Sequence, residues 1–304
     1  MKRLFLAGLA AVLSCVPGAG AAGESGWSLV EGWGAEVSTT LTGVTGIALD
    51  ARGRVYVAGG EGAAIVVLNP DGKEIARWGD FIGAKHGLRI FGERVFVTDT
   101  DRHTVSVCTL DGRVLRTLGV PGEAGADERH FNKPTDVALA DDGTVYIADG
   151  YGNSRIVCLS PAFEYQFEWG RAGSRPGEFM YPHNVVLLGG SVYVADHENR
   201  RIQVFDRDGA LLAVWTHVGK PFGLAVGSDG SLYVSHIVSP YGVAEHGVMR
   251  LSPAGEILES FGTEGRAPGQ FLVPHSLAVG PDARSLFVGE VSSSRVQKFE
   301  RTRP

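Results

Sequence analysis

A segment of about 40–50 residues repeats along this 304-residue chain, and each repeat opens in the same way. A short apolar stretch leads into a tight turn rich in Gly and Asp, and an alternating strand such as Val145–Ala148 follows. The six openings read VTGIALDARGRVYVA from Val44, KHGLRIFGERVFVT from Lys85, PTDVALADDGTVYIA from Pro134, PHNVVLLGGSVYVA from Pro182, PFGLAVGSDGSLYVS from Pro221 and PHSLAVGPDARSLFVG from Pro274.

Two further strands complete each repeat. Third strands read SRIVCLS, RRIQVFD and SRVQKFE, and an Asp-Gly turn commonly follows them. The fourth strand ends in an aromatic residue or Leu, usually before Gly, as in Trp78-Gly79 and Trp169-Gly170. Four strands per repeat at this spacing are typical of propeller blades, so the sequence predicts an all-β, six-bladed β-propeller.

The sixth repeat lacks its fourth strand, because the chain ends with FERTRP after the third. A matching segment stands at the other end of the chain, where GWSLVEGWG closes with Trp33-Gly34. We expect a strand Trp27–Trp33 to pair with the strand around Arg295–Glu300 and to close the ring, which removes exposed sheet edges. Residues 26–302 then form a single propeller domain.

The first 22 residues are interpreted as a secretory signal peptide. Lys2-Arg3 precede the apolar run Leu4–Leu13, which is too short to span a bilayer, and the small residues GAGAAG follow. Cleavage after Ala21 or Ala22 gives a secreted or periplasmic protein. The alternative is a lipid anchor on Cys15, because VLSC loosely resembles a lipobox.

The charge of the chain limits its partners. The net charge is −6, and Lys and Arg form no basic stripe. A nucleic acid is not expected as a ligand, because binding phosphates requires clustered positive charge. We expect a monomer that binds a small peptide-like substrate or an exported protein.

Two cysteines remain in the predicted mature chain. Cys108 in VSVCTL and Cys158 in RIVCLS stand at matching points of third strands in neighbouring repeats. Such points lie farther apart than the roughly 7 Å between Cα atoms that a disulfide allows. We therefore expect two buried, unpaired thiols.

Three histidines occupy the same place in alternate repeats. His86 in KHGL, His183 in PHNV and His275 in PHSL each open a first strand. If the repeats form a ring, these imidazoles point at one axis, and three neutral imidazoles form a metal site with an open position. A histidine at a strand start can instead cap a turn, and repeats share ancestry, so this second interpretation stays open.

The loops after the second strands should surround that centre, because the second strand returns to the face where the first begins. DGYGN carries Tyr151, and DHENR carries His197 and Glu198. These side chains are candidates for contacting whatever binds there, since binding sites are concave and have a few converging polar groups.

The repeats resemble NHL-repeat propellers over nearly the whole mature sequence, and more closely the peptidyl-α-hydroxyglycine α-amidating lyase domain. The resemblance lies in HFNKPTDVALADDGTVYIADGYGNSRIVCLSP, in PGEFMYPHNVVLL followed by YVADHENRRIQVF, and in VPHSLAV. It implies a six-bladed propeller with zinc held by His86, His183 and His275, and with the family tyrosine beside the zinc at Tyr151.

Three positions depart from that family. Gly60 and His197 stand where the family has two arginines. Ser276 stands where it has an aspartate that binds a structural calcium, whose carbonyl ligands would correspond to Ile47 and Leu88. The sequence thus keeps the zinc ligands and the tyrosine but argues against the calcium.

The resemblance implies a zinc-dependent lyase that splits R–CO–NH–CH(OH)–COO⁻ into an amide and glyoxylate. Tyr151 would act as acid or base, and a protonated His197 would bind part of the carboxylate. The alternative is a non-catalytic NHL-repeat propeller that binds a protein or another exported ligand, since a fold alone does not decide function. A calcium lactonase-type propeller ranks lowest, because Thr45, Thr135 and Phe222 alternate with the histidines instead of Glu, Asp and Asn.

Overall fold

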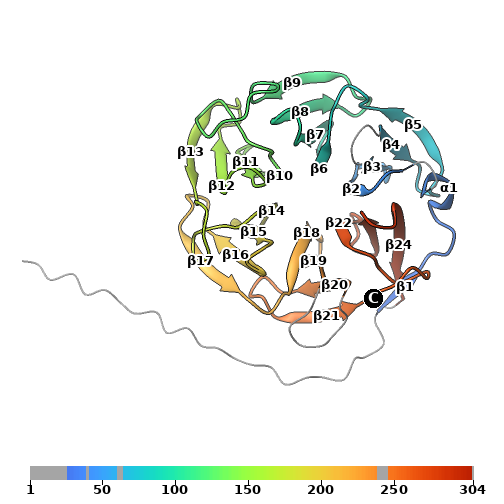
Figure 1. The fold of residues 1–304 in the computed structure, drawn as a ribbon. Helices are drawn as coiled ribbons and strands as arrows, with labels where there is room; N and C mark the ends of the chain where they lie inside the picture. The colour runs from blue at the N-terminus through green and yellow to red at the C-terminus, as the bar shows by residue number, and fades with distance from the viewer. Residues whose placement is uncertain (1–25, 39–40, 60–63, 238–245, 303–304) are drawn as a thin grey trace, which may run out of the picture.

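The computed structural model describes residues 26–38, 41–59, 64–237 and 246–302, which form a ring of six four-stranded antiparallel sheets (Figure 1). The prediction of a six-bladed β-propeller is confirmed. Blade one comprises β2 (Val44–Leu49), β3 (Val55–Gly59), β4 (Ile65–Leu68) and β5 (Glu74–Trp78). Blade two comprises β6 (Lys85–Phe91), β7 (Arg94–Asp99), β8 (Thr104–Thr109) and β9 (Val114–Leu118). Blade three comprises β10 (Asp136–Leu139), β11 (Val145–Asp149), β12 (Arg155–Leu159) and β13 (Tyr165–Trp169). Blade four comprises β14 (Pro182–Leu188), β15 (Ser191–Asp196), β16 (Arg201–Phe205) and β17 (Leu211–Trp215). Blade five comprises β18 (Lys220–Val226), β19 (Leu232–Ile237), β20 (His246–Leu251) and β21 (Ile257–Phe261). Blade six comprises β22 (Pro274–Val279), β23 (Ser285–Glu290), β24 (Arg295–Arg301) and β1 (Trp27–Leu29).

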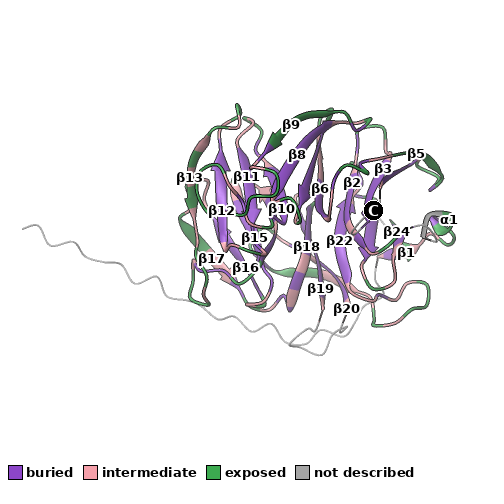
Figure 2. Cartoon of the chain, turned by 45° about the horizontal axis from the view of Figure 1, so that its top comes forward, coloured by how far each residue is buried: buried purple, intermediate pink, exposed green. Residues whose placement is uncertain are grey.

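The inner strands are buried because neighbouring blades cover both of their faces. Every residue of β3 and β11 is buried, whereas β5 and β9 at the rim are mostly exposed (Figure 2). The core lies between blades, as where Tyr193 of blade four joins one cluster with Leu224 and Val234 of blade five. Burying apolar surface contributes about 25 cal/mol per Å², so contacts between blades supply much of the stability of the ring.

A tryptophan that ends a fourth strand packs on a glycine of the next blade. Trp78 lies against Gly112 in the turn before β9, where an added Cβ would come 2.5 Å from the indole. Gly112 also has a φ of 89°, a conformation that side chains other than glycine rarely adopt. Trp169 and Gly209 repeat this contact. It explains why an aromatic residue in one repeat accompanies an Asp-Gly turn in the next.

β1 closes the ring by pairing antiparallel with β24, with Trp27 opposite Arg301 and Leu29 opposite Phe299. Closure by the N-terminal strand is therefore confirmed. Figure 1 shows β1 beside β24 near the C-terminus.

The closing strand is shorter than the predicted Trp27–Trp33, because it ends at Leu29. Gly32 and Gly34 have φ values of 74° and 69°, and residues 31–34 form a turn instead. Trp33 nevertheless packs on Gly72 of blade one, in the same way as the other fourth-strand aromatics.

The expected signal peptide over residues 1–22, with the alternative anchor Cys15, lies outside the described residues, as does Gly60. The described part of the chain contains no helix that is long and apolar enough to cross a membrane. Its short helix α1 spans Ala35–Ser38.

Both cysteines are buried and unpaired, as predicted, with Cys108 in β8 and Cys158 in β12. Burial raises the pKa of each thiol to about 11, so neither is a thiolate at neutral pH. They act as small apolar groups of the core.

Candidate metal centre

The three axial histidines meet at the centre of the ring of blades. His86 is the second residue of β6, and His183 and His275 hold the same place in β14 and β22. Their ring centroids are 4.6, 4.9 and 4.7 Å apart, and their potential ligand atoms lie within 4.8 Å of one another. The structure thus brings together, from every second blade, the histidines that the sequence singled out.

A backbone carbonyl of the next blade orients each of these rings. The Nδ1-to-oxygen distances are 2.8 Å from His86 to Thr135, 3.0 Å from His183 to Phe222 and 3.0 Å from His275 to Thr45. Since a carbonyl can only accept, each Nδ1 carries the proton and each Nε2 keeps its lone pair. Metal-binding histidines are ordinarily fixed by such a bond from their second nitrogen.

Tyr151 reaches the same point. Its hydroxyl lies 2.9 Å from Nε2 of His86 and 3.0 Å from Nε2 of His183, yet it has one proton to donate. Burial lowers the pKa of all three histidines and raises that of Tyr151, so the imidazoles are neutral and the phenol is protonated at pH 7. The three Nε2 lone pairs therefore face one another, and the Tyr151 hydroxyl has only one proton to share with them. Such a set of nitrogen ligand atoms suits a cation such as zinc.

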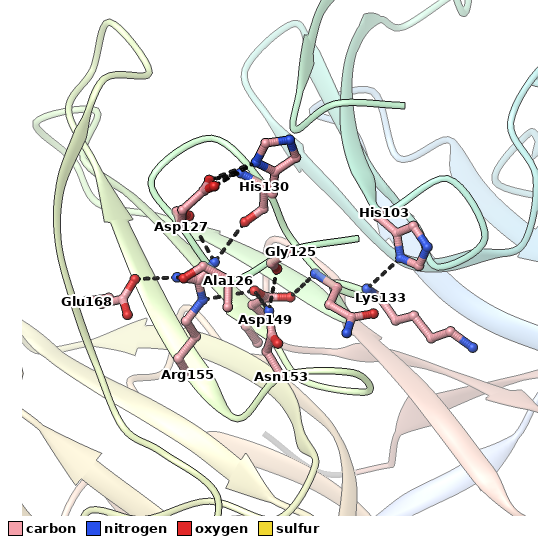
Figure 3. Close-up of polar contacts among 12 residues, drawn as sticks. His103, Gly125, Ala126, Asp127, His130, Lys133, Asp149, Asn153, Arg155 and Glu168 are labelled. Atoms are coloured by element: carbon pink, nitrogen blue, oxygen red, sulfur yellow. Dashed lines mark hydrogen bonds and ion pairs between the residues drawn. The ribbon is translucent and has the colours of Figure 1, made fainter. Parts of the chain in front are cut away.

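The loop that carries Tyr151 is fixed by a buried ion pair (Figure 3). Asp149 ends β11, and its carboxylate accepts hydrogen bonds from Nε of Arg155 at 3.0 Å and from the side-chain amide of Asn153 at 2.7 Å. The guanidinium also donates to three carbonyls of the preceding connector, those of Ala126, Asp127 and His130. These bonds hold the loop against its neighbours and so position Tyr151.

Two further blades contain the same ion pair. Arg201 bonds Asp196 at 2.6 Å in blade four, and Arg295 bonds Glu290 at 2.5 Å in blade six. Sequence reasoning missed these pairs, although an arginine begins the third strand in SRIVCLS, RRIQVFD and SRVQKFE.

His197 lies beside the axial histidines but is not a cation. Its ring stacks on that of His183 with centroids 5.0 Å apart, and its Nδ1 donates to the carbonyl of Pro221 at 2.9 Å. Burial lowers the pKa of His197 to about 4, because the ring loses the solvation that stabilises its charged form. The expectation of a protonated His197 in place of the family arginine therefore does not hold at neutral pH.

A cation close to His197 comes from Lys220, a residue that sequence reasoning missed. Lys220 begins β18, and its Nζ lies 2.7 Å from Oε1 of Glu198. The same oxygen lies 3.6 Å from Nε2 of His197, and the side chains of Lys220 and Glu198 stay 26% and 35% exposed. These three residues form a chain of contacts from the surface to the histidines. The sequence feature that could have identified Lys220 is its place directly before the proline that opens the fifth repeat.

Fold and centre together define a six-bladed propeller with three histidines grouped on its axis. A family model described as the NHL repeat matches residues 131–159 and 179–205. The NHL repeat-containing protein 3 of Homo sapiens is 31% identical over 274 residues, which cover 83% of this chain and 78% of that protein. The chain belongs to the NHL-repeat family.

The relatives also include enzymes. The peptidyl-alpha-hydroxyglycine alpha-amidating lyase 1 of Drosophila melanogaster is 30% identical over 266 residues, or 78% of this chain and 48% of that protein. This chain therefore spans about half the length of that relative. A solved gluconolactonase from Xanthomonas campestris is 15% identical with a TM-score of 0.63, covering 86% of both chains, and that likeness shows the fold alone.

Proposed function

We propose that this chain is an exported, zinc-dependent lyase that cleaves a peptidyl-α-hydroxyglycine into a peptide amide and glyoxylate. One observation carries the proposal: three histidine nitrogens group on the axis, with the Tyr151 hydroxyl within hydrogen-bond distance of two of them. The similarity to the Drosophila lyase supports the reaction class. The signal-peptide pattern of residues 1–22 supports export.

His86, His183 and His275 would hold the metal through Nε2. Zinc is favoured, because three neutral imidazoles beside an open position are typical of catalytic zinc sites. Bound there, zinc would act as a Lewis acid and lower the pKa of a coordinated hydroxyl.

Tyr151 is placed to move the proton that the reaction requires. The carbon–nitrogen bond breaks with its electron pair on nitrogen, and one proton passes from the substrate hydroxyl to that nitrogen. Burial raises the pKa of Tyr151, so its hydroxyl holds a proton at pH 7. It can donate that proton to the leaving nitrogen and take up the hydroxyl proton in exchange.

We assign the substrate carboxylate to Lys220. The substrate carboxylate would take the place of Glu198 beside the Lys220 ammonium, which lies 2.7 Å from Glu198 in the free protein. His197 has its proton on Nδ1, so its Nε2 accepts hydrogen bonds and would orient the hydroxyl or N–H of the substrate instead.

The test is glyoxylate release from a peptidyl α-hydroxyglycine by the zinc-loaded protein. We expect release by the wild type. The rate should be lower by a factor of about 10² or more in Tyr151→Phe, because a general acid–base group typically contributes at least that factor. Tyr181→Phe is the matched control, since the Tyr181 ring centroid lies 5.8 Å from that of Tyr151 but the residue is 44% exposed. We expect near wild-type release from this control.

A folded, zinc-loaded wild type without glyoxylate release would favour the second candidate, a non-catalytic propeller that binds a peptide or an exported protein. A specific observation favours this candidate: His197 is neutral and Lys220 is already paired with Glu198. Peptide binding that is equally strong in Tyr151→Phe would then be expected.

A further inference from the structure

A second polar cluster lies on the axis next to the histidines. The first strands of all six blades line a cavity of about 10 Å³, the room of roughly one water molecule. Arg89, Asp136, Asn184 and Ser276 contribute polar side chains to its wall. None of these four residues takes part in the proposed reaction.

Arg89 bridges this cavity from blade two. Its Nε and Nη2 bond the two carboxylate oxygens of Asp136 in blade three at 3.0 and 2.6 Å. The same Nη2 lies 2.6 Å from Oδ1 of Asn184 in blade four and 3.1 Å from the carbonyl of Leu224 in blade five. One guanidinium therefore joins four consecutive blades.

Backbone N–H groups hold the two side chains that accept hydrogen bonds from Arg89. Asp136 is 0% exposed, and its carboxylate also accepts the backbone N–H of Val185 at 3.0 Å. Oδ1 of Asn184 also accepts the N–H of Leu224 at 2.9 Å. A buried carboxylate requires a counter-charge, and the guanidinium of Arg89 supplies it.

The cavity residues do not fit the calcium that the amidating-lyase resemblance implies beside Ile47, Leu88 and position 276. Calcium takes about six to eight oxygen ligands, with carboxylates prominent among them. Ser276 offers a hydroxyl in place of a carboxylate, and its buried Oγ has no hydrogen-bond partner. The carboxylate of Asp136 is already bound by Arg89.

We propose that the Arg89 guanidinium is a built-in cation that replaces a structural calcium and joins blades two to five at the axis. The fold then requires no calcium. This inference does not depend on the proposed lyase activity, because none of its residues contacts the reacting groups.

The first test is the melting temperature of full-length protein that has been stripped of metals and reloaded with zinc alone. The wild type should melt at the same temperature with and without added calcium. Arg89→Met should melt roughly 6–10 °C lower, because Asp136 loses its counter-charge. Arg94→Met, which removes an exposed arginine from the neighbouring strand β7, should shift the melting temperature little. A calcium-stabilised wild type, or equal melting of the two variants, would overturn the proposal.

A second variant asks whether the guanidinium stands in for a metal. Arg89→Ser combined with Ser276→Asp removes the cation and adds the missing carboxylate. This double variant should melt at a higher temperature when calcium is added, unlike the wild type. If it folds and ignores calcium, the guanidinium does not replace a metal ion, and that part of the proposal is wrong.

Discussion

At the scale of single residues, each axial histidine depends on the backbone of the next blade. The carbonyls that receive Nδ1–H belong to Thr45, Thr135 and Phe222, which hold the equivalent place in the odd-numbered blades. Every residue has a carbonyl, so these positions can differ in side chain and still fix the imidazole tautomer. This explains how Thr and Phe serve the same purpose around one centre.

The buried histidines should make stability depend on pH. Burial lowers the pKa of His197 and of His236 to about 4, whereas imidazoles of the unfolded chain titrate near ~6.5. The unfolded state therefore binds more protons below that pH, and stability falls as the pH drops from about 6.5 toward 4. At about pH 5 each histidine should cost roughly 2 kcal/mol relative to pH 7.5.

Urea midpoints of the metal-free protein at these two pH values measure this effect. The axial histidines add to the effect, because burial lowers their pKa values too. His236→Asn removes one of these buried groups and should make the midpoint depend less on pH. Identical midpoints at both pH values would contradict the neutral, buried state of these rings.

Lys220 should govern substrate affinity more than the chemical step. Lys220→Met should raise KM about tenfold or more with little change in kcat, because a charge-assisted hydrogen bond typically contributes about 1.5–3 kcal/mol. Lys220→Arg should keep most of the affinity. Lys73→Met, in the exposed turn before β5, is the control and should leave KM unchanged. An unchanged KM in Lys220→Met would place the carboxylate elsewhere.

The sequence predicted His86, His183 and His275, because the repeats align them without any knowledge of contacts. It predicted Tyr151 from the place of its loop after a second strand and from the family resemblance. It did not predict the charge of His197 or the position of Lys220. Both depend on burial and on contacts between blades, since His197 bonds Pro221 from the next repeat and Lys220 reaches back to Glu198. The repeats predict which residues are equivalent, but they do not predict how deeply each of these residues is buried.

At the scale of elements, the fourth strands and the turns of the next blade form one interlocking rim. The tryptophans Trp78, Trp169 and Trp215 end fourth strands and pack on glycines of the next blade that could not accept a Cβ, and Trp33 packs on Gly72 in the same way. The sequence predicted the closing segment from this aromatic ending. It overestimated the length of the strand, because the left-handed conformations of Gly32 and Gly34 belong to a turn.

Removing the closing segment should weaken the ring strongly. Deletion of residues 26–34 exposes the edge of β24 and removes Trp27, which is buried and packs edge-on against Tyr233 with ring centroids 6.1 Å apart. Loss of a buried aromatic alone costs about 3–5 kcal/mol, so the melting temperature should fall by roughly 6 °C or more, with aggregation. Ser28→Ala, at an exposed position of the same strand, should melt like the wild type. Unchanged melting of the deletion variant would refute the role of β1 in closure.

At the scale of the whole molecule, the ring is what turns three distant sequence positions into one centre. Blades two, four and six supply the histidines, and blades one, three and five supply the carbonyls that orient them. On the same axis, Arg89 joins blades two to five. The repeat predicted the ring and the column of histidines. Predicting the Arg89 cluster would require knowing which side chains of the first strands face the axis.

The most direct test of the central claim is the zinc content of the purified, zinc-loaded protein by elemental analysis. We predict about one zinc per chain in the wild type and loss of that zinc in His183→Ala, because two imidazoles leave a weak site. His217→Ala is the control and should keep the zinc, since its ring bonds the carbonyl of Gly255 away from the centre. A folded wild type that retains no zinc, or a His183→Ala variant that retains as much as the wild type, would contradict the account.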